Sequence, residues 1–97
     1  MKILNFGSLN IDYTYSVDHI VHPGETITSG SLEVFPGGKG LNQSIALARA
    51  GADVYHAGLI GEDGIFLRDL CRESGVKTGY IRETETRTGN AIIQVSE

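Results

Sequence analysis

The sequence predicts an α/β fold built on a parallel β-sheet, and three observations favour this class. Strand-like segments alternate with helix-like segments in the order strand, helix, strand, helix, and such alternation is typical of parallel strands joined by crossovers. A glycine follows each helix-like segment, at the point where helices commonly end in a left-handed residue. The sequence is 40% hydrophobic and mixed in composition, as globular domains are.

The N-terminal third is predicted to consist of strands and one loop. Residues 3–6 form a short apolar cluster that predicts a buried first strand. Apolar and polar residues then alternate over 11–17, which indicates a strand with one polar face. Residues 18–25 contain Pro23-Gly24, a turn dipeptide, and are predicted to be a loop. Residues 26–35 are expected to form one or two strands around Gly30.

The middle of the chain predicts two helices separated by a strand. Leu41, Ile45 and Ala48 form an apolar stripe at helical spacing, and Gly51 is the expected left-handed cap. The apolar stretch 53–61 predicts a second core strand. The next segment, "EDGIFLRDLCRESG", has a second helical pattern and ends at Gly75.

The C-terminal segment predicts a polar hairpin-like stretch from residue 78, followed by a strand at 91–95. Two helices cannot cover both faces of a parallel sheet. We therefore expect the 97 residues to be the N-terminal part of a larger domain.

Composition excludes several classes of protein. The net charge is −4 and there is no basic run, so a nucleic-acid partner is not expected. No apolar run approaches the length of about 18–20 residues that a membrane span needs, and the N-terminus turns polar too early for a secretory signal. Cys71 is the only cysteine, which leaves no internal disulfide and fits a reducing compartment. The expected location is the cytoplasm.

A glycine-rich loop, "PGGKGLN" at residues 36–42, directly precedes the first predicted helix. It is not a Walker A loop, because Gly40 follows Lys39 where that loop needs Ser or Thr, and Glu33 stands where its first glycine should be. No segment has the spacing of the dinucleotide-binding fingerprint. Free N–H groups at a helix start can hold negative charge or hydroxyl oxygens. A tight strand-to-helix turn without a ligand is the alternative.

Four stretches together resemble the ribokinase-like, or PfkB, carbohydrate-kinase family. They are "GSLNIDYTY", "PGET", "PGGKGLNQSIALARAGADV" and "GLIGEDGIFLRDLCRESGV". Their order and spacing cover nearly the whole chain, and within the family they look most like the ribokinase-type members. The resemblance implies the N-terminal part of a Rossmann-like three-layer α/β fold. It also implies a small β-sheet lid, formed by strands at about 11–35 and 88–96 and inserted on the α/β core.

The resemblance also implies an activity, transfer of the γ-phosphoryl group of ATP to a hydroxyl of a small sugar, with ribose as the first candidate. ATP, Mg²⁺ and a monovalent cation are the implied cofactors, and the lid implies a homodimer. The ATP-binding part and the catalytic base of the family lie beyond the matching positions. We therefore expect residues 1–97 to bind sugar weakly and not to turn over ATP. A non-catalytic sugar-binding or dimerisation module is the alternative, and a dinucleotide-dependent oxidoreductase is a more distant one.

The resemblance assigns sugar-binding roles to six positions. An amide and a carboxylate two residues apart lie on one face of an extended segment, where they can bind adjacent hydroxyl groups. Backbone amides of the glycine loop, an ammonium group and a second amide side chain complete the set. The predicted sugar-binding residues are Asn10, Asp12, Gly38, Lys39, Gly40 and Asn42. Without the resemblance, the preferred interpretation would be that Asn10 and Asp12 are turn formers, Asn42 a helix cap and Lys39 a solvated loop charge.

No catalytic, cofactor-binding or metal-binding residue is assigned in this chain. His19, His22 and Glu25 could suggest a metal site, but they lie in a proline turn without a fixed helical face, and a surface loop is the preferred interpretation. His56 lies in an apolar strand and is expected to be a core histidine, and Cys71 is expected to be a buried hydrophobe.

Overall fold

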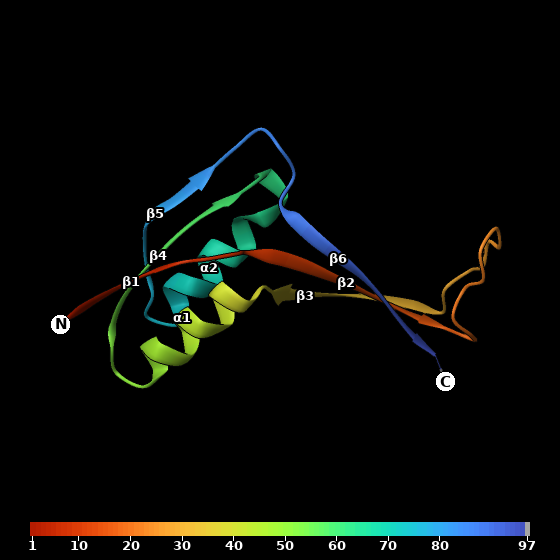
Figure 1. The fold of residues 1–97 in the computed structure, drawn as a ribbon, viewed down its shortest axis with the longest axis horizontal. Coiled ribbons are helices and arrows are strands. Elements are labelled where there is room, and N and C mark those ends of the chain that lie inside the picture. The colour runs from red at the N-terminus through yellow and green to blue at the C-terminus, as the bar shows by residue number, and fades with distance from the viewer. Residues whose placement is uncertain (97) are drawn as a thin grey trace.

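The structure is a computed structural model that describes residues 1–96 and contains two small sheets and two α-helices. The chain begins at one end of the long axis and passes through both sheets (Figure 1). The elements are β1 (Lys2–Phe6), β2 (Asn10–Val17), β3 (Ser31–Gly37), α1 (Lys39–Arg49), β4 (Asp53–Ile60), a 3₁₀ turn (Glu62–Gly64), α2 (Ile65–Glu73), β5 (Lys77–Glu83) and β6 (Gly89–Ser96). The predicted mixed α/β class is confirmed.

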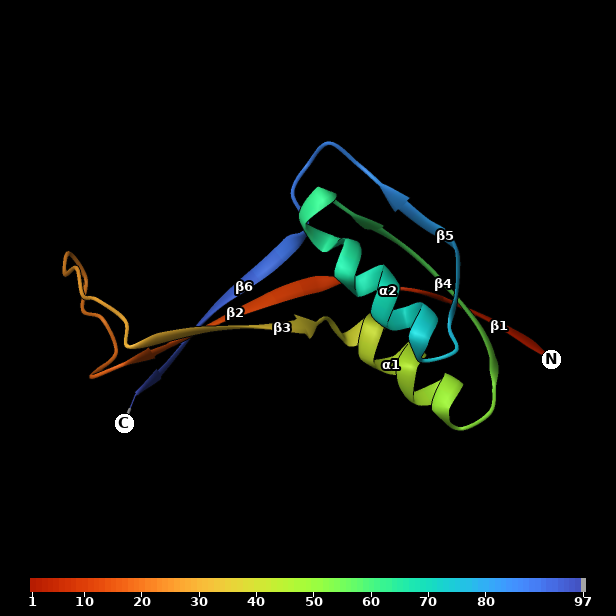
Figure 2. The ribbon, with the colours of Figure 1, turned by 180° about the vertical axis from the view of Figure 1, so that it is seen from behind.

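The core sheet has the strand order β1-β4-β5, and all its strands are parallel. Helices α1 and α2 pack on the same side of this sheet (Figures 1 and 2). On β4, Val54, His56 and Ile60 point toward the helices and are fully buried. Val54 and Ile60 join Leu41 of α1 and Leu67 of α2 in the hydrophobic core that holds this layer together.

The opposite face of the core sheet is bare. Leu4 and Phe6 of β1 are 63% and 82% exposed, and Leu59 of β4 is 61% exposed. These side chains border a hollow of about 540 Å³ that also touches Tyr55 and Tyr80. The prediction that the first strand is buried is therefore wrong for one of its faces, because no helix of the described chain covers that side.

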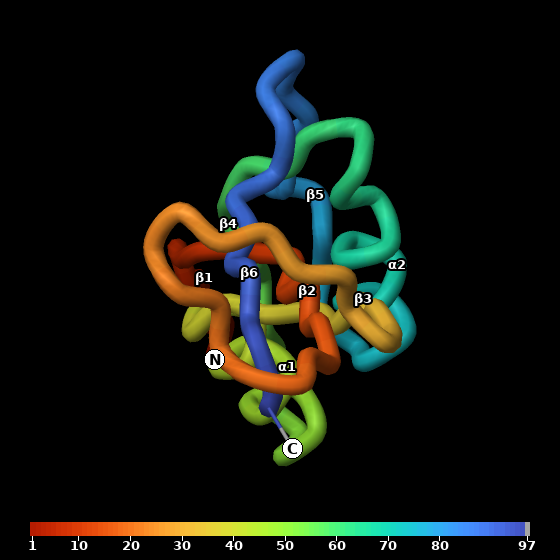
Figure 3. Tube along the Cα trace, turned by 90° about the vertical axis from the view of Figure 1, so that its right-hand side faces the viewer, coloured from red at the N-terminus to blue at the C-terminus, as the bar shows by residue number. Residues whose placement is uncertain are grey.

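The outer sheet has the order β3-β2-β6 and extends away from the core. Strand β2 pairs antiparallel with β3 and parallel with β6. Figure 3 looks onto the end of the molecule that carries this sheet. Ile11 of β2 is buried in the main core and Tyr13 packs against it, so one face of β2 joins the two sheets.

The structure differs from the sequence prediction in two segments, at residues 77–83 and at the start of β3. The hairpin-like interpretation from residue 78 is wrong, because Lys77–Glu83 forms a core strand parallel to β4. Only Ile81 of this edge strand is buried, so its apolar periodicity is too weak to identify it. Strand β3 begins after Gly30, whose N–H donates to the Ser16 carbonyl at 2.8 Å.

Both helices end where the glycines predicted. Gly51 has φ 94° and Gly75 has φ 91°, in the left-handed region where a side chain is costly. Cys71 is buried on α2, as expected. Within residues 1–96, neither helix has the length and apolar character needed to cross a bilayer.

Candidate functional site

The candidate site lies where the outer sheet joins the core. Strand β3 leads directly into α1 through Gly38, and β2 begins beside it at Asn10. The pairing register places Asn10 opposite Gly37 of β3 and opposite Gly89 of β6. Three segments that are far apart in the sequence therefore meet at one junction, and most of the predicted sugar-binding residues lie there.

Asp12 presents its carboxylate beside Gly37. A Cβ atom placed on Gly37 would lie 2.6 Å from both carboxylate oxygens, so the carboxylate rests against the bare backbone of β3. Asp12 is half-buried, and none of the ion pairs between described residues involves it. The carboxylate is therefore held in place while its acceptor oxygens remain available.

The side chain of Asn10 lies against Gly89 of β6, as that of Asp12 lies against Gly37 of β3. A Cβ atom on Gly89 would lie 2.7 Å from the Asn10 side-chain oxygen. Because Asn10 and Asp12 are two residues apart on one strand, both side chains lie on the same face of the outer sheet. Ile11 and Tyr13, which lie between and after them, face the core. Glycines 37 and 89 were not predicted as site residues, although each leaves room for one polar side chain.

The glycine loop requires glycine for backbone reasons. Gly38 has φ 104°, and a Cβ atom there would lie 2.6 Å from the Ser8 carbonyl oxygen. Gly40 packs on Gly7, whose Cα atom would lie 2.6 Å from an added Cβ. The loop thus crosses the end of β1 at close range. The backbone here is a tight strand-to-helix turn, as the alternative interpretation proposed. Such a turn is compatible with ligand binding at the helix start.

No side chain among the described residues caps the start of α1. Gly38 is the N-cap residue, and the first turn contains no acidic side chain. The Leu41 amide donates to the Ser8 carbonyl at 3.1 Å, whereas the described residues supply no such acceptor for the amides of Lys39 and Gly40. These N–H groups carry the partial positive charge of the helix start.

Lys39 and Asn42 are exposed on the first turn of α1. Asn42 is therefore not the helix cap that one alternative proposed, because it lies inside the helix and its amide donates to the Gly38 carbonyl at 3.1 Å. Both residues lie on the first turn of α1, which directly follows the junction in the chain. The structure thus brings the Asp12 carboxylate, the Asn10 amide and the start of α1 to one region.

A buried polar network supports the loop from below. Asn5 donates its side-chain N–H groups to the Gly40 carbonyl and to Ser44 Oγ, both at 3.0 Å. Ser44 Oγ lies 2.7 Å from His56 Nδ1, and His56 Nε2 lies 3.0 Å from the Gly7 carbonyl. Because the carbonyl needs a donor, Nε2 carries the hydrogen and Nδ1 accepts from Ser44. The network ties β1, α1 and β4 together under the glycine loop.

Burial lowers the pKa of His56 below its ordinary value, and the hydrogen bond to Gly7 opposes this only in part. The neutral ring is the form that fits the network, since it donates at one nitrogen and accepts at the other. His56 is thus a hydrogen-bonded core histidine, as expected. The polar residue in the apolar strand β1, Asn5, was the signal in the sequence that could have revealed its partners.

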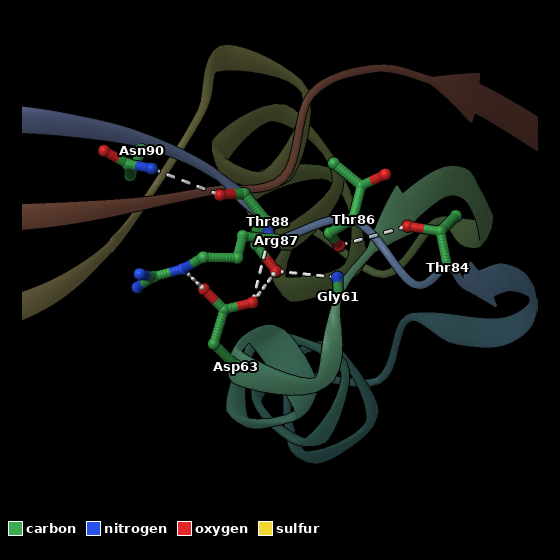
Figure 4. A network of polar contacts seen from close by, with 7 residues as sticks. All are labelled: Gly61, Asp63, Thr84, Thr86, Arg87, Thr88 and Asn90. Carbon is green, nitrogen blue, oxygen red and sulfur yellow. Dashed lines mark hydrogen bonds and ion pairs between the residues drawn. The ribbon is translucent and has the colours of Figure 1, made fainter.

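A second network anchors β6 to the core (Figure 4). Asp63 accepts from the Thr88 amide at 2.9 Å and from the Thr88 hydroxyl at 2.8 Å. The Thr88 hydroxyl in turn accepts from the Gly61 amide at 2.8 Å. The bonds from Thr88, with a smaller contribution from Arg87, lower the pKa of Asp63. This anchor holds the residue next to Gly89, and so fixes the strand on which Asn10 rests.

The arrangement is suited to a neutral ligand that is rich in hydroxyl groups. A carboxylate accepts hydrogen bonds, an amide side chain both donates and accepts, and helix amides and an ammonium group donate. A triphosphate is disfavoured at the same place, because the half-buried Asp12 carboxylate would repel it. The junction can therefore orient a polyol.

Comparisons with known proteins agree with this chemistry. The family described as pfkB family carbohydrate kinase matches residues 1–97. Ribokinase of Haemophilus influenzae is 38% identical over 94 residues, which is 94% of this chain and 31% of that relative. Ribokinase of Bacillus subtilis is 37% identical over 99 residues, which is 99% of this chain and 34% of that relative.

Solved structures show the same fold. Ribokinase from Cryptococcus neoformans var. grubii serotype A in complex with ADP has a TM-score of 0.90 and 44% identity, over 98% of this chain and 30% of that one. Arabidopsis thaliana ribokinase complexed with ribose and ATP has a TM-score of 0.85 and 28% identity, over 98% of this chain and 32% of that one. The chain spans about a third of the length of these relatives. Because the family match extends over the whole chain, the protein belongs to the pfkB family of carbohydrate kinases.

Proposed function

We propose that this chain is the sugar-binding part of an ATP-dependent sugar kinase that phosphorylates a hydroxyl group of ribose or a closely related small sugar. The observation that carries the proposal is the shared face of β2, where Asp12 and Asn10 stand beside the uncapped start of α1. The similarity to ribokinases, one of them solved with ribose and ATP, supports ribose as the first candidate.

Each group at the junction has a role in this proposal. The Asp12 carboxylate accepts hydrogen bonds from two neighbouring hydroxyl groups, and the Asn10 amide fixes the orientation of the ring. The amides of Gly38 and Gly40 donate to sugar oxygens. Lys39 and Asn42 bind from the first turn of α1. Together they hold one hydroxyl in position for phosphoryl transfer, a reaction that depends mainly on positioning and electrostatics.

ATP, Mg²⁺ and a monovalent cation are proposed to bind outside this chain. The junction offers a carboxylate where a triphosphate would need cationic groups, and Asp12 is better used to hold the acceptor than to hold a nucleotide. When bound, Mg²⁺–ATP supplies the phosphoryl group. We accordingly propose that residues 1–97 alone do not turn over ATP and that they form the N-terminal part of a single sugar-kinase domain.

The outer sheet is proposed to act as the lid over the sugar and as a dimer contact. Among residues 1–96, its two outer strands, β3 and β6, each leave one edge unpaired, and such edges favour pairing with another chain. Val34 of β3 and Ile92 of β6 are 48% and 70% exposed, so apolar area is available for a second copy. Closure of a lid would exclude water from the reacting groups. The cytoplasm remains the proposed location, with Cys71 reduced.

The proposal is tested by saturation-transfer NMR of the chain with ribose and a panel of other pentoses and hexoses. We expect ribose signals that disappear in Asp12→Ala and persist in Asp18→Ala, an exposed carboxylate beyond the site. Gly37→Ala should also weaken the signals, because its methyl group would displace the Asp12 carboxylate. Equal signals from the wild-type chain and Asp12→Ala would show that the sugar binds elsewhere.

A further inference from the structure

The loop between β2 and β3 brings together three residues that can bind a metal ion. This loop forms the far tip of the outer sheet (Figure 2). The sequence predicted a surface loop in which His19, His22 and Glu25 lack a fixed helical face, and all three are exposed in a loop. Within this loop, one nitrogen of each ring and one carboxylate oxygen of Glu25 all lie within 4.8 Å of one another.

A tight turn fixes the spacing of two of these residues. The Glu25 amide donates to the His22 carbonyl at 3.0 Å, and Gly24 has φ 78°. With Pro23 before Gly24, this is the pattern of a type II turn, which has proline at its second position and glycine at its third. The turn therefore holds His22 and Glu25 at a constant separation, independently of any helix.

The side chains already converge on the carboxylate. His19 Nε2 lies 2.9 Å from one Glu25 oxygen and 3.1 Å from the other. The His22 amide donates to the same carboxylate at 3.0 Å, and the two imidazole rings are stacked with centroids 5.5 Å apart. The bond from the His22 amide, followed by the bond from His19, lowers the pKa of Glu25.

We propose that His19, His22 and Glu25 form a binding site for a first-row divalent cation of the Zn²⁺ type, with water in the remaining positions. Two imidazole nitrogens and one carboxylate oxygen are a ligand set that Zn²⁺ accepts, with bonds of about 2.0–2.2 Å. Tetrahedral bonds of that length hold ligand atoms about 3.3–3.6 Å apart. The present separations of up to 4.8 Å would close to that value by rotation of the exposed side chains. Mg²⁺ and Ca²⁺ fit less well, because they prefer oxygen ligands.

The charge around the loop favours a cation. Residues 3–38 contain no lysine or arginine, and residues 88–97 contain none either, so the whole outer sheet lacks cationic side chains. Asp18 adds a second carboxylate at the end of β2. The side chains of His19 and Glu25 are 46% and 33% exposed, which leaves the site open to solvent. An exposed ion pair between these two residues would contribute little by itself.

The bound ion would join the end of β2 to the start of the segment that leads into β3. Seven residues, 19–25, would be closed by ligand bonds in addition to the turn. The tip of the outer sheet would thereby lose conformational freedom, as in other cases where metal binding couples to local folding. This role does not depend on sugar binding or on phosphoryl transfer.

The test is isothermal titration of the untagged 97-residue chain with ZnCl₂ in a weakly chelating buffer. We expect one ion per chain, and a loss in affinity of at least about tenfold in His19→Ala and in His22→Ala, since each removes one of three ligands. Glu25→Gln should weaken binding in the same way. Glu33→Gln, an exposed carboxylate on β3 of the same sheet, should bind as the wild type does.

A second measurement separates this site from any other. In ¹⁵N NMR spectra, Zn²⁺ should shift the amide signals of residues 18–26 and leave those around Cys71 unchanged. The proposal is wrong if no heat is released at millimolar Zn²⁺. It is also wrong if the double variant H19A/H22A binds as tightly as the wild type, or if binding is equally tight in concentrated urea, where the turn is lost.

Discussion

Substitution of Thr88 by valine isolates the anchor that joins β6 to the core. Valine has nearly the same shape as threonine but lacks the hydroxyl group. In the folded chain, the Thr88 hydroxyl accepts from the Gly61 amide and donates to Asp63, both at 2.8 Å. Thr88 is 2% exposed, so water cannot replace the lost partner without a local opening.

The expected cost follows from the Gly61 amide. Gly61 is buried, and a buried donor without an acceptor costs about 1–3 kcal/mol. The substitution creates no cavity, so no packing loss is added. For a domain of this size, 1 kcal/mol corresponds to about 4–8 °C in the unfolding midpoint. We therefore expect Thr88→Val to lower the midpoint by at least about 4 °C.

The control is Thr86→Val, in the segment that leads from β5 to β6. Thr86 is exposed, and only its backbone carbonyl accepts a hydrogen bond, from the Thr84 hydroxyl at 3.2 Å. This variant should stay within about 0.5 kcal/mol of the wild type. Thermal unfolding followed by far-UV circular dichroism gives the midpoint of both variants. Coincident unfolding curves for Thr88→Val and Thr86→Val would refute the view that the Thr88 hydroxyl anchors β6.

Two further predictions concern the dimer contact and His56. Ile92 of the outer sheet is 70% exposed, so Ile92→Lys should reduce self-association in sedimentation velocity, whereas Phe6→Lys on the bare face of the core sheet should leave the distribution unchanged; dissociation by Phe6→Lys alone would assign association to the core sheet instead. Because the folded state keeps His56 neutral, the unfolded state binds more protons below pH about 6.5, and stability should fall as the pH is lowered from about 7.5 to about 5.5. His56→Gln should flatten this dependence and His22→Gln should not; equal slopes for all three proteins would contradict the assignment.

Much of the fold could be predicted because local signals were strong. The apolar stripe of the first helix and the left-handed Gly51 mark α1 without reference to any other part of the chain. Strand β5 was missed because a single buried position, Ile81, carries its packing, and one apolar residue creates no periodicity. The sequence predicted that two helices would leave part of the sheet bare, but not that Phe6 would lie on the bare face, since burial depends on what covers a face and not on the residue that lies there.

Part of the candidate site could likewise be predicted from the sequence, and part could not. The resemblance to a family indicated Asn10, Asp12 and the glycine loop, because the motifs that contain them stand in this chain in the order and spacing of that family. It did not indicate Gly89, which lies 79 residues after Asn10 and becomes its neighbour only through the parallel pairing of β2 with β6. At the turn near His22 the sequence predicted only a surface loop without a fixed helical face, and the structure brings one side-chain atom each of His19, His22 and Glu25 within 4.8 Å of one another.

The sequence by itself determined the α/β class, the two helix ends, the absence of a nucleotide-binding glycine motif and the side chains available to a sugar. These depend on contacts between residues close in the chain, where propensity and spacing act directly. The tertiary structure alone decided which strands became neighbours, which sheet face stayed bare and which glycines make room for Asp12 and Asn10. Such choices arise from long-range pairing and close packing, in which each residue is placed by partners that its local sequence does not specify.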